Sequence, residues 1–327
     1  MNNTIAFAAL AFAFTGSALA QHCSTVRLDL QGGPVESIPI INQGSLNVCR
    51  FVTATDLISA ALFYQGSKTK HLSWVSTYAD AASGDGYQNV RKMMDRARAN
   101  GVCTTDAIVG ALRSSATTCR EVAEVKNTFG LTLTSNSQQT CEPLPPDDHR
   151  GGMELTRTNH LLAYALGAKA PSYRAVSEAV TFACKSDRID ASKISDVRYV
   201  FGHQLPVAAR SLAFRQHIDE VLTEPKPMPI GIAYCADVLF KRDATGVDPV
   251  DGKHSITICT DSGGHVSSIV GRRARGSQCQ YLVRNSWGRS CNKGYDTANP
   301  CEEGKIWVDS ADLIRNTIYT FSIKAAE

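Results

Sequence analysis

In three stretches of the chain, apolar residues recur every three or four positions, the spacing that places them on one face of a helix. The predicted helices cover residues 52–62, 87–99 and 210–222. The first is expected to be amphipathic, with an apolar face made of Ala54, Leu57, Ile58, Ala61 and Leu62. The apolar face of the second is made of Val90, Met93, Met94 and Ala97. Asn100-Gly101 predicts the end of the second helix.

The C-terminal third instead contains short runs rich in β-branched and aromatic residues, which predict strands. These runs are residues 228–234, 255–259, 265–271, 280–285, 305–308 and 318–323. Turn residues separate most of them, so we expect an antiparallel, barrel-like sheet. The basic run Arg272–Arg275 follows one strand and is interpreted as a solvated turn. The pattern predicts an α+β fold in which a helical lobe precedes a β-rich lobe.

The remaining segments are assigned by their composition. Residues 1–20 contain a short apolar run followed by Ala18-Leu19-Ala20, which is typical of a secretory signal peptide. Gly32–Asn42 is interpreted as an extended arm. Residues 21–327 are predicted to form one domain, with a helical lobe at about 43–111, an insertion at about 112–205 and a β-rich lobe at about 206–327. The signal peptide predicts a secreted or periplasmic protein.

Composition and charge exclude several classes of function. The chain has 327 residues, 43% of them hydrophobic and 20% charged, which is ordinary for a globular protein. A net charge of +3 is too small to indicate nucleic acid or an anionic membrane as a partner. No segment after the signal peptide approaches transmembrane length, so we expect no membrane anchor. No histidine has a zinc-type spacing to cysteine pairs, so we expect no metal and no cofactor.

The eleven cysteines are an odd number, which leaves at least one free thiol if the others form disulfides. An exported protein meets an oxidising compartment that favours disulfides. If Cys49 is free, the other ten could form five bridges, although several could instead be buried thiols. Cys291 and Cys301 are close in sequence and are predicted to close a short disulfide loop.

Cys49 lies just before the first predicted helix, with Gln43 six residues upstream. Unpaired N–H groups and the helix dipole favour negative charge at a helix N-terminus, so this position is expected to lower the pKa of a thiol. Because the thiolate is the nucleophilic form, a reactive cysteine is one interpretation of Cys49. A half-cystine or a buried core thiol is the alternative.

Two downstream motifs favour the reactive interpretation. His265 opens a predicted strand, and Asn285-Ser286-Trp287-Gly288 ends the next one. Together with Gln43 and Cys49, in this order along the chain, these motifs resemble the papain-like cysteine peptidases. The resemblance implies that Cys49 is the nucleophile, His265 the general base and Asn285 the residue that orients the base. Gln43 would hold the oxyanion.

The same resemblance implies how a substrate would bind. The glycine turn that contains Gly86 would pair with an extended peptide, and Tyr87 would line the main specificity pocket. Trp287 would lie beside the His265–Asn285 bond and shield it from water. The expected fold has two lobes with the active-site cleft between them. The expected substrate is a protein or peptide, cleaved by a monomeric enzyme through an acyl-enzyme.

The chain also departs from the family pattern. Arg50 replaces the aromatic residue that usually follows the nucleophile. Leu46 and Ser83 stand where the family has the two cysteines of one disulfide. The separation of Cys49 and His265 exceeds the usual 130–150 residues, in agreement with an insertion. Since few residues lie between Gln21 and Cys49, the sequence predicts no inhibitory propeptide, and the alternative is that the insertion is a lid that must be cut.

Other interpretations stay open. His254 also precedes a predicted strand and is the rival general base. The protein could be a different Cys-His acyl-transfer enzyme, such as a cell-wall peptide amidase or a transglutaminase-like enzyme. It could also be a non-catalytic peptide-binding module on the same fold.

Overall fold

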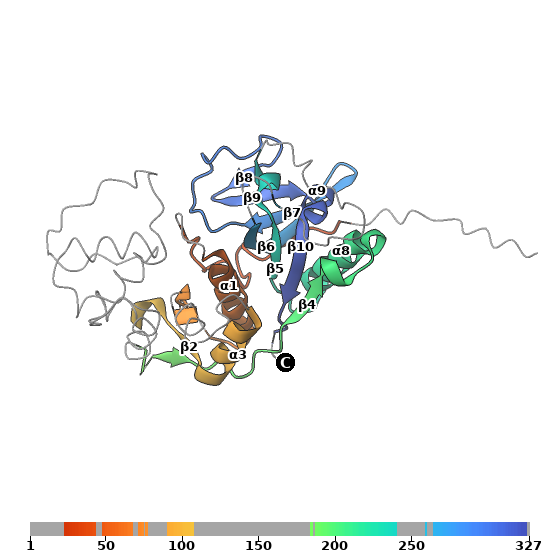
Figure 1. The fold of residues 1–327 in the computed structure, drawn as a ribbon. Helices are drawn as coiled ribbons and strands as arrows, with labels where there is room; N and C mark the ends of the chain where they lie inside the picture. The colour runs from red at the N-terminus through yellow and green to blue at the C-terminus, as the bar shows by residue number, and fades with distance from the viewer. Residues whose placement is uncertain are drawn as a thin grey trace, which may run out of the picture.

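A computed structural model describes most of the two predicted lobes (Figure 1). The described residues are 23–43, 48–67, 71–74, 76–77, 90–107, 184–185, 187–240, 259 and 264–325. Within these ranges, no helix is both long enough and apolar enough to cross a membrane. Helices and an antiparallel sheet are both present, so the predicted α+β class is confirmed.

The β-rich part is one eight-stranded sheet with the order β4-β10-β5-β6-β7-β9-β8, to which β1 is added by pairing with β6. Its strands are β1 (Val26–Arg27), β4 (Arg198–Phe201), β5 (Ile230–Cys235), β6 (Gly264–Arg275), β7 (Gln278–Arg284), β8 (Cys301–Glu302), β9 (Lys305–Asp309) and β10 (Thr317–Ser322). All of these pairings are antiparallel, as expected. Strand β4 belongs to this sheet although it lies before residue 206, within the range assigned to the insertion.

Helix α1 (Cys49–Tyr64) packs against β6, β5 and α3 (Val90–Asn100). The apolar face predicted for it is buried, but Thr53, Thr55 and Asp56 are buried as well. The predicted helix and its apolar face are therefore confirmed, but the polar side of α1 is enclosed as well. Because α1 lies between α3 and the sheet, nearly its whole circumference is enclosed (Figure 1).

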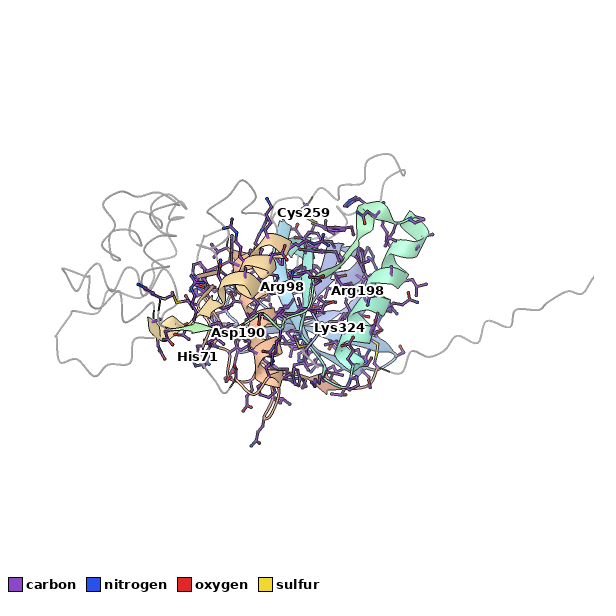
Figure 2. The ribbon with its side chains drawn as sticks, turned by 90° about the horizontal axis from the view of Figure 1, so that it is seen from below. His71, Arg98, Asp190, Arg198, Cys259 and Lys324 are labelled. Atoms are coloured by element: carbon purple, nitrogen blue, oxygen red, sulfur yellow. A yellow bond between two sulfur atoms is a disulfide. The ribbon has the colours of Figure 1, made fainter. Side chains whose placement is uncertain are left out.

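Helix α3 confirms the second helical pattern over its described residues. Its four predicted core residues, Val90, Met93, Met94 and Ala97, are all buried. Gly101 follows the last helical residue with a φ of +69°, a conformation that glycine adopts without steric cost. Arg98 forms ion pairs with Asp95 in the same helix and with Asp196, so it ties α3 to the chain that leads into β4 (Figure 2).

Helix α8 (Val207–Thr223) corresponds to the third helical pattern and packs against β10, β4, β5 and β6. Figures 1 and 2 show α1 and α8 on opposite sides of the sheet. Every residue of β5 is buried, which is expected of a strand covered on both faces. The remaining elements are short: η1 (Gly202–Gln204), η2 (Ala236–Leu239), α9 (Ser310–Arg315) and the pair β2 (Val102–Cys103) with β3 (Arg188–Ile189).

Four disulfides join described residues: Cys23–Cys279, Cys103–Cys184, Cys235–Cys259 and Cys291–Cys301. The last of these confirms the predicted short loop. Among the described cysteines, Cys49 is the free one, and it is buried. Cys119 and Cys141 lie outside the described residues.

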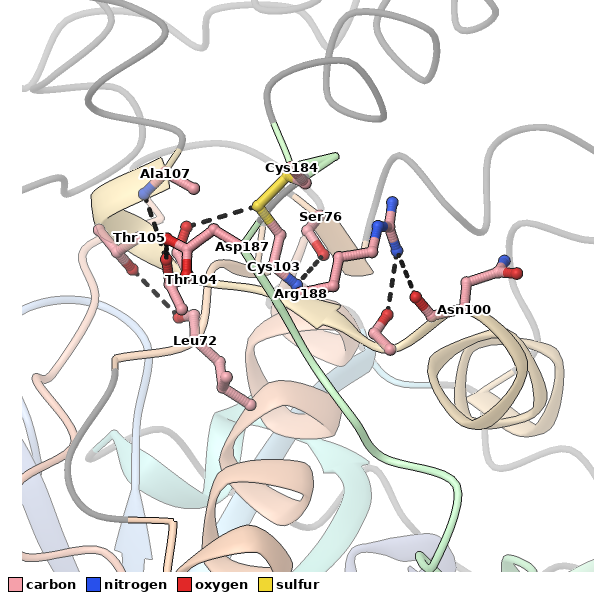
Figure 3. The surroundings of a disulfide bond; sticks show 11 residues. Leu72, Ser76, Asn100, Cys103, Thr104, Thr105, Ala107, Cys184, Asp187 and Arg188 are labelled. Carbon is pink, nitrogen blue, oxygen red and sulfur yellow. Dashed lines mark hydrogen bonds between the residues drawn. A yellow bond between two sulfur atoms is a disulfide. The ribbon is translucent and has the colours of Figure 1, made fainter.

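The Cys103–Cys184 disulfide joins a residue of the predicted helical lobe to one within the range predicted for the insertion (Figure 3). Nearby, Thr104 Oγ1 donates a hydrogen bond to Asp187, and Arg188 donates to the carbonyl of Gly101. These contacts and the β2–β3 pairing hold the chain at residue 107 close to the chain at residue 184.

Two local predictions are wrong. Arg272–Arg275 continues β6 instead of forming a solvated turn, because its first two arginines are bound: Arg272 pairs with Asp219, and Arg273 lies over the ring of Trp307. The arm Gly32–Asn42 is extended only in its last part. Its first part is a series of turns, closed by hydrogen bonds such as that from the Val35 N–H to the Leu28 carbonyl.

Several predictions fall on residues outside the described ranges. These are the signal peptide, the substrate-binding residues Gly86 and Tyr87, the rival base His254, the positions Leu46 and Ser83, and most of the strand 255–259.

Candidate active site

Cys49 is the first residue of α1, and its side chain is 3% exposed. Burial raises the pKa of its thiol above the usual value. The backbone N–H of Val266 and the charge of Arg50 act in the opposite direction. The helix N-terminus was expected to lower this pKa, so the expectation is wrong in net direction, since the cost of desolvating a thiolate exceeds the favourable contacts.

His265 is the second residue of β6 and lies opposite Tyr234 of β5. Its ring is buried, and its Nε2 is 2.8 Å from the side-chain oxygen of Asn285. Burial lowers the pKa of His265 to about 4, although the hydrogen bond with Asn285 opposes this shift. In this environment the imidazole is neutral at neutral pH.

Asn285 directly follows β7, and its three hydrogen bonds define how its amide is oriented. Its side-chain oxygen lies near His265 Nε2 and also accepts from the backbone N–H of Ser286 at 2.7 Å. Its Nδ2 donates to the hydroxyl of Tyr295 at 3.3 Å. Since the oxygen faces His265, the proton of the neutral ring is assigned to Nε2. The other ring nitrogen, Nδ1, is then the acceptor that a general base requires.

The packing of α1 on β6 connects Cys49 with His265. The thiol lies near the backbone N–H of Val266, the residue after His265, which acts to lower the pKa of the thiol. The thiol therefore lies beside the strand position that carries the imidazole. Although they are far apart in sequence, the two residues occupy adjoining parts of the same helix–strand interface.

Gln43 lies beside the Asn-Ser-Trp-Gly segment. Its backbone N–H donates to the Ser286 carbonyl at 2.8 Å, and the Gly288 N–H donates to the Ile41 carbonyl at 3.0 Å. The Ser286 hydroxyl also donates to the side-chain oxygen of Gln43. This contact turns the oxygen of the Gln43 amide toward Ser286 and its Nε2 away from it. This role of Ser286 in orienting the Gln43 amide was not predicted from the sequence.

An aromatic stack covers the imidazole. The ring of Trp287 lies over His265 with centroids 4.6 Å apart and an interplanar angle of 29°. Phe240 stacks on Trp287, and Tyr295 stacks on Phe240, in each case with centroids 5.7 Å apart. No local sequence pattern marks Phe240 and Tyr295 as part of the site. They come together there through a β-bridge between residues that are far apart in the chain.

A pocket lies elsewhere, between α1, the arm and residues 71–74. Neither Cys49 nor His265 lines it, so we do not assign this pocket to the reaction. In the described part of the chain, no group of three or more histidine, cysteine or acidic side chains is placed to hold a metal ion.

No protein-family model matches the chain, and no curated protein matches it in sequence. Among solved structures, one that it is similar to is the digestive procathepsin L2 proteinase from Tenebrio molitor larval midgut, with 15% identity and a TM-score of 0.45, covering 93% of this chain and 69% of the other. A second is xylellain, a cysteine protease from Xylella fastidiosa, with 15% identity and a TM-score of 0.46, covering 95% and 90%. A third is procathepsin B S9 from Trypanosoma congolense, with 11% identity and a TM-score of 0.46, covering 96% and 81%. These likenesses cover between 93% and 96% of this chain.

Proposed function

We propose that the protein is a cysteine peptidase that hydrolyses peptide bonds through Cys49, His265, Asn285 and Gln43. The observation that carries this proposal is the orientation of His265. Its Nε2 is held by Asn285, which leaves Nδ1 as the proton acceptor, and the free thiol of Cys49 lies beside the same strand. A nucleophile, a base and a residue that orients the base are the parts that acyl transfer requires.

In the proposed reaction, His265 Nδ1 takes the proton of the Cys49 thiol as the sulfur attacks the scissile carbonyl carbon. The imidazolium then gives this proton to the leaving amine, which releases the first product and leaves an acyl-enzyme. A water molecule gives a proton to His265 and attacks the acyl carbonyl, which releases the acid and restores the thiol. Burial favours the neutral thiol and the neutral imidazole in the resting site, so charge separation accompanies the attack.

The carbonyl oxygen gains negative charge in each attack. Gln43 Nε2 and the backbone N–H of Cys49 are the proposed donors to this oxyanion. The contact between the Ser286 hydroxyl and the Gln43 oxygen supports this role, because it sets the orientation of the amide. Trp287 covers the His265–Asn285 bond, which favours the bond by excluding water.

The proposed substrate is a protein or peptide outside the cytoplasm. The signal-peptide pattern of residues 1–20 supports export, and the four disulfides among the described residues fit an oxidising compartment. Gly86 and Tyr87 remain proposed substrate-binding residues on the ground of the family resemblance alone. A monomer without a membrane anchor or bound nucleic acid remains the proposed form.

The test is labelling of the exported protein with an epoxide inhibitor of cysteine peptidases, followed by mass spectrometry of its peptides. We expect one modified residue, Cys49, and loss of peptidase activity in proportion to labelling. Cys49→Ala should lower kcat/KM by at least about 10³-fold while the thermal unfolding temperature stays close to that of the wild type. Cleavage of cell-wall peptides without cleavage of proteins would instead identify an amidase, and full activity of Cys49→Ala would refute the proposal.

A further inference from the structure

A buried ion pair joins Asp56 and Arg284. The side chain of Arg284 is 4% exposed and that of Asp56 is 5% exposed, and Arg284 Nε is 3.1 Å from Asp56 Oδ2. The same carboxylate oxygen accepts a hydrogen bond from the Ser268 hydroxyl at 2.8 Å. Arg284 Nη2 donates to the carbonyls of Ile38 at 3.0 Å and Pro39 at 2.6 Å.

Each member of this network lies on a segment that carries one of the four proposed reaction residues. Asp56 is on α1, about two helical turns after Cys49. Ser268 is on β6, on the strand that begins with Gly264 and His265. Arg284 is the last residue of β7 and directly precedes Asn285. Ile38 and Pro39 belong to the arm that leads to Gln43.

Burying the charged groups of such a network costs free energy. Removing a carboxylate and a guanidinium from water carries a desolvation penalty that their mutual attraction offsets only when further hydrogen bonds are made. The Ser268 hydroxyl and the two arm carbonyls supply such bonds here. Since apolar residues of similar volume often stabilise a fold at least as well, stability alone does not account for the pair.

We propose that the Asp56–Arg284 pair is a positioning device for the active site, a role that rests on the proposed function. It holds α1 at a set distance from β6, β7 and the arm, and so places the Cys49 thiol against His265. Neither residue touches the reacting atoms. Displacement of a reacting group by about 1 Å can lower a rate by about 10²-fold, so loss of the pair reaches the chemistry through geometry.

The chain offers a control in a second ion pair, in which Arg272 is buried and Asp219 is half-buried. Asp219 of α8 is 2.6 Å from Arg272 of β6 and also accepts from the Tyr281 hydroxyl at 3.1 Å. This pair joins helix α8 to strand β6 of the sheet. Asp219→Asn therefore removes the acidic partner of a helix–sheet ion pair, as Asp56→Asn does, but at helix α8 instead of α1.

The experiment compares wild type, Asp56→Asn and Asp219→Asn at a temperature at which circular dichroism shows all three folded. The first measurement is kcat and KM on a peptide substrate. The second is the rate of Cys49 alkylation by iodoacetamide as a function of pH.

For Asp56→Asn we expect kcat to fall about 10- to 100-fold with little change in KM. Alkylation assisted by His265 at neutral pH should weaken, so that the rate follows the ionisation of the buried thiol, whose pKa burial holds above its usual value. Asp219→Asn should keep kcat within about twofold of the wild type.

Arg284→Lys serves as a second variant in case Asp56→Asn fails to fold, because it keeps the positive charge but loses the forked set of donors. We expect the same fall in kcat and the same change in the alkylation profile. A wild-type kcat and profile in a folded Asp56→Asn or Arg284→Lys protein would overturn the positioning role, as would an equal loss of kcat in Asp219→Asn. If the proposed function itself were wrong, Cys49→Ala would retain activity, because turnover by the wild type would not depend on Cys49. That result is distinct from the outcomes above.

Discussion

The indole of Trp287 lies over the imidazole of His265, with ring centroids 4.6 Å apart. The two residues come from the ends of neighbouring strands, β6 and β7, and the His265–Asn285 hydrogen bond lies beside their stacked rings. Phe240 in turn stacks on Trp287. The imidazole is therefore enclosed by aromatic surface, and this burial is the cause of its lowered pKa.

Replacing Trp287 tests the effect of this enclosure. In Trp287→Ala, water can reach the His265–Asn285 bond, so we expect kcat/KM to fall by roughly 10-fold and the pKa of His265 to move up toward its ordinary value. The measurement is the pH profile of kcat/KM. Trp287→Phe keeps an aromatic ring over the imidazole and should retain most of the activity. An unchanged acid limb in Trp287→Ala would show that the indole does not set this pKa.

Asn285→Ala removes the group that orients the base but leaves the base itself. We expect kcat to fall by about 10²-fold, less than in Cys49→Ala, because His265 can still accept a proton when its ring happens to face the thiol. Steady-state kinetics on one peptide substrate measures this difference. Tyr295→Phe is the matched control, since it removes only the hydroxyl that Asn285 donates to, and it should cost only a few-fold. A loss as large as that of Cys49→Ala would mean that Asn285 does more than orient the ring.

Gln43 and Ser286 are expected to act as a unit. Gln43→Ala removes one oxyanion donor and should lower kcat by about 10²–10³-fold. Ser286→Ala leaves the amide in place but removes the bond that orients it, so its effect should be smaller. In the double variant, the loss should equal that of Gln43→Ala alone, because Ser286 acts through Gln43. Steady-state kinetics of the wild type, the two single variants and the double variant measure this coupling. If the losses in kcat of the two single variants add in the double variant, Ser286 does not act through Gln43.

The acid limb of the pH profile should lie well below the ordinary titration of histidine. A protonated His265 cannot accept the thiol proton, so kcat/KM is lost as the pH falls through its pKa. Burial lowers this pKa from 6.5 to about 4, and the neutral base therefore persists under mildly acidic conditions. We expect kcat/KM to fall by half near pH 4 in profiles measured with a neutral peptide substrate. A limb centred at 6.5 would mean that the imidazole is solvated in the working enzyme.

His217 should make the stability of the fold depend on pH. Its ring is buried between the hydroxyls of Thr320 and Ser322, and burial, followed by the charge of Arg198, lowers its pKa to about 4. The unfolded chain binds the proton more readily, so the stabilisation is complete above about pH 6.5 and is lost as the pH falls toward 4. The shift corresponds to about 3 kcal/mol.

Urea unfolding at several pH values measures this effect, in the Cys49→Ala background to prevent self-digestion. The free energy of unfolding should fall between pH 6.5 and 4, and His217→Gln should reduce the slope. His265 contributes a slope of the same sign, so the variant should retain part of the pH dependence. An identical slope with and without His217 would show that this ring does not report on unfolding.

Local patterns in the sequence identified the elements that carry the proposed reaction residues. The helix after Cys49 follows from the spacing of its apolar residues, and the strands that carry His265 and Asn285 follow from their β-branched content. The Cys291–Cys301 disulfide follows from proximity along the chain. These features depend on neighbouring residues, so they can be inferred without knowledge of the tertiary structure.

Burial and long-range pairing were decided only by the tertiary structure. Asp56 looks like the polar side of an amphipathic helix until β6 and β7 enclose it and Arg284 pairs with it. Arg272 likewise continues a strand because Asp219, on a distant helix, binds its charge. The pKa of the Cys49 thiol is the clearest case. Its place at a helix N-terminus is local and favours the thiolate, whereas desolvation by the surrounding fold is non-local and larger, so the pKa is raised.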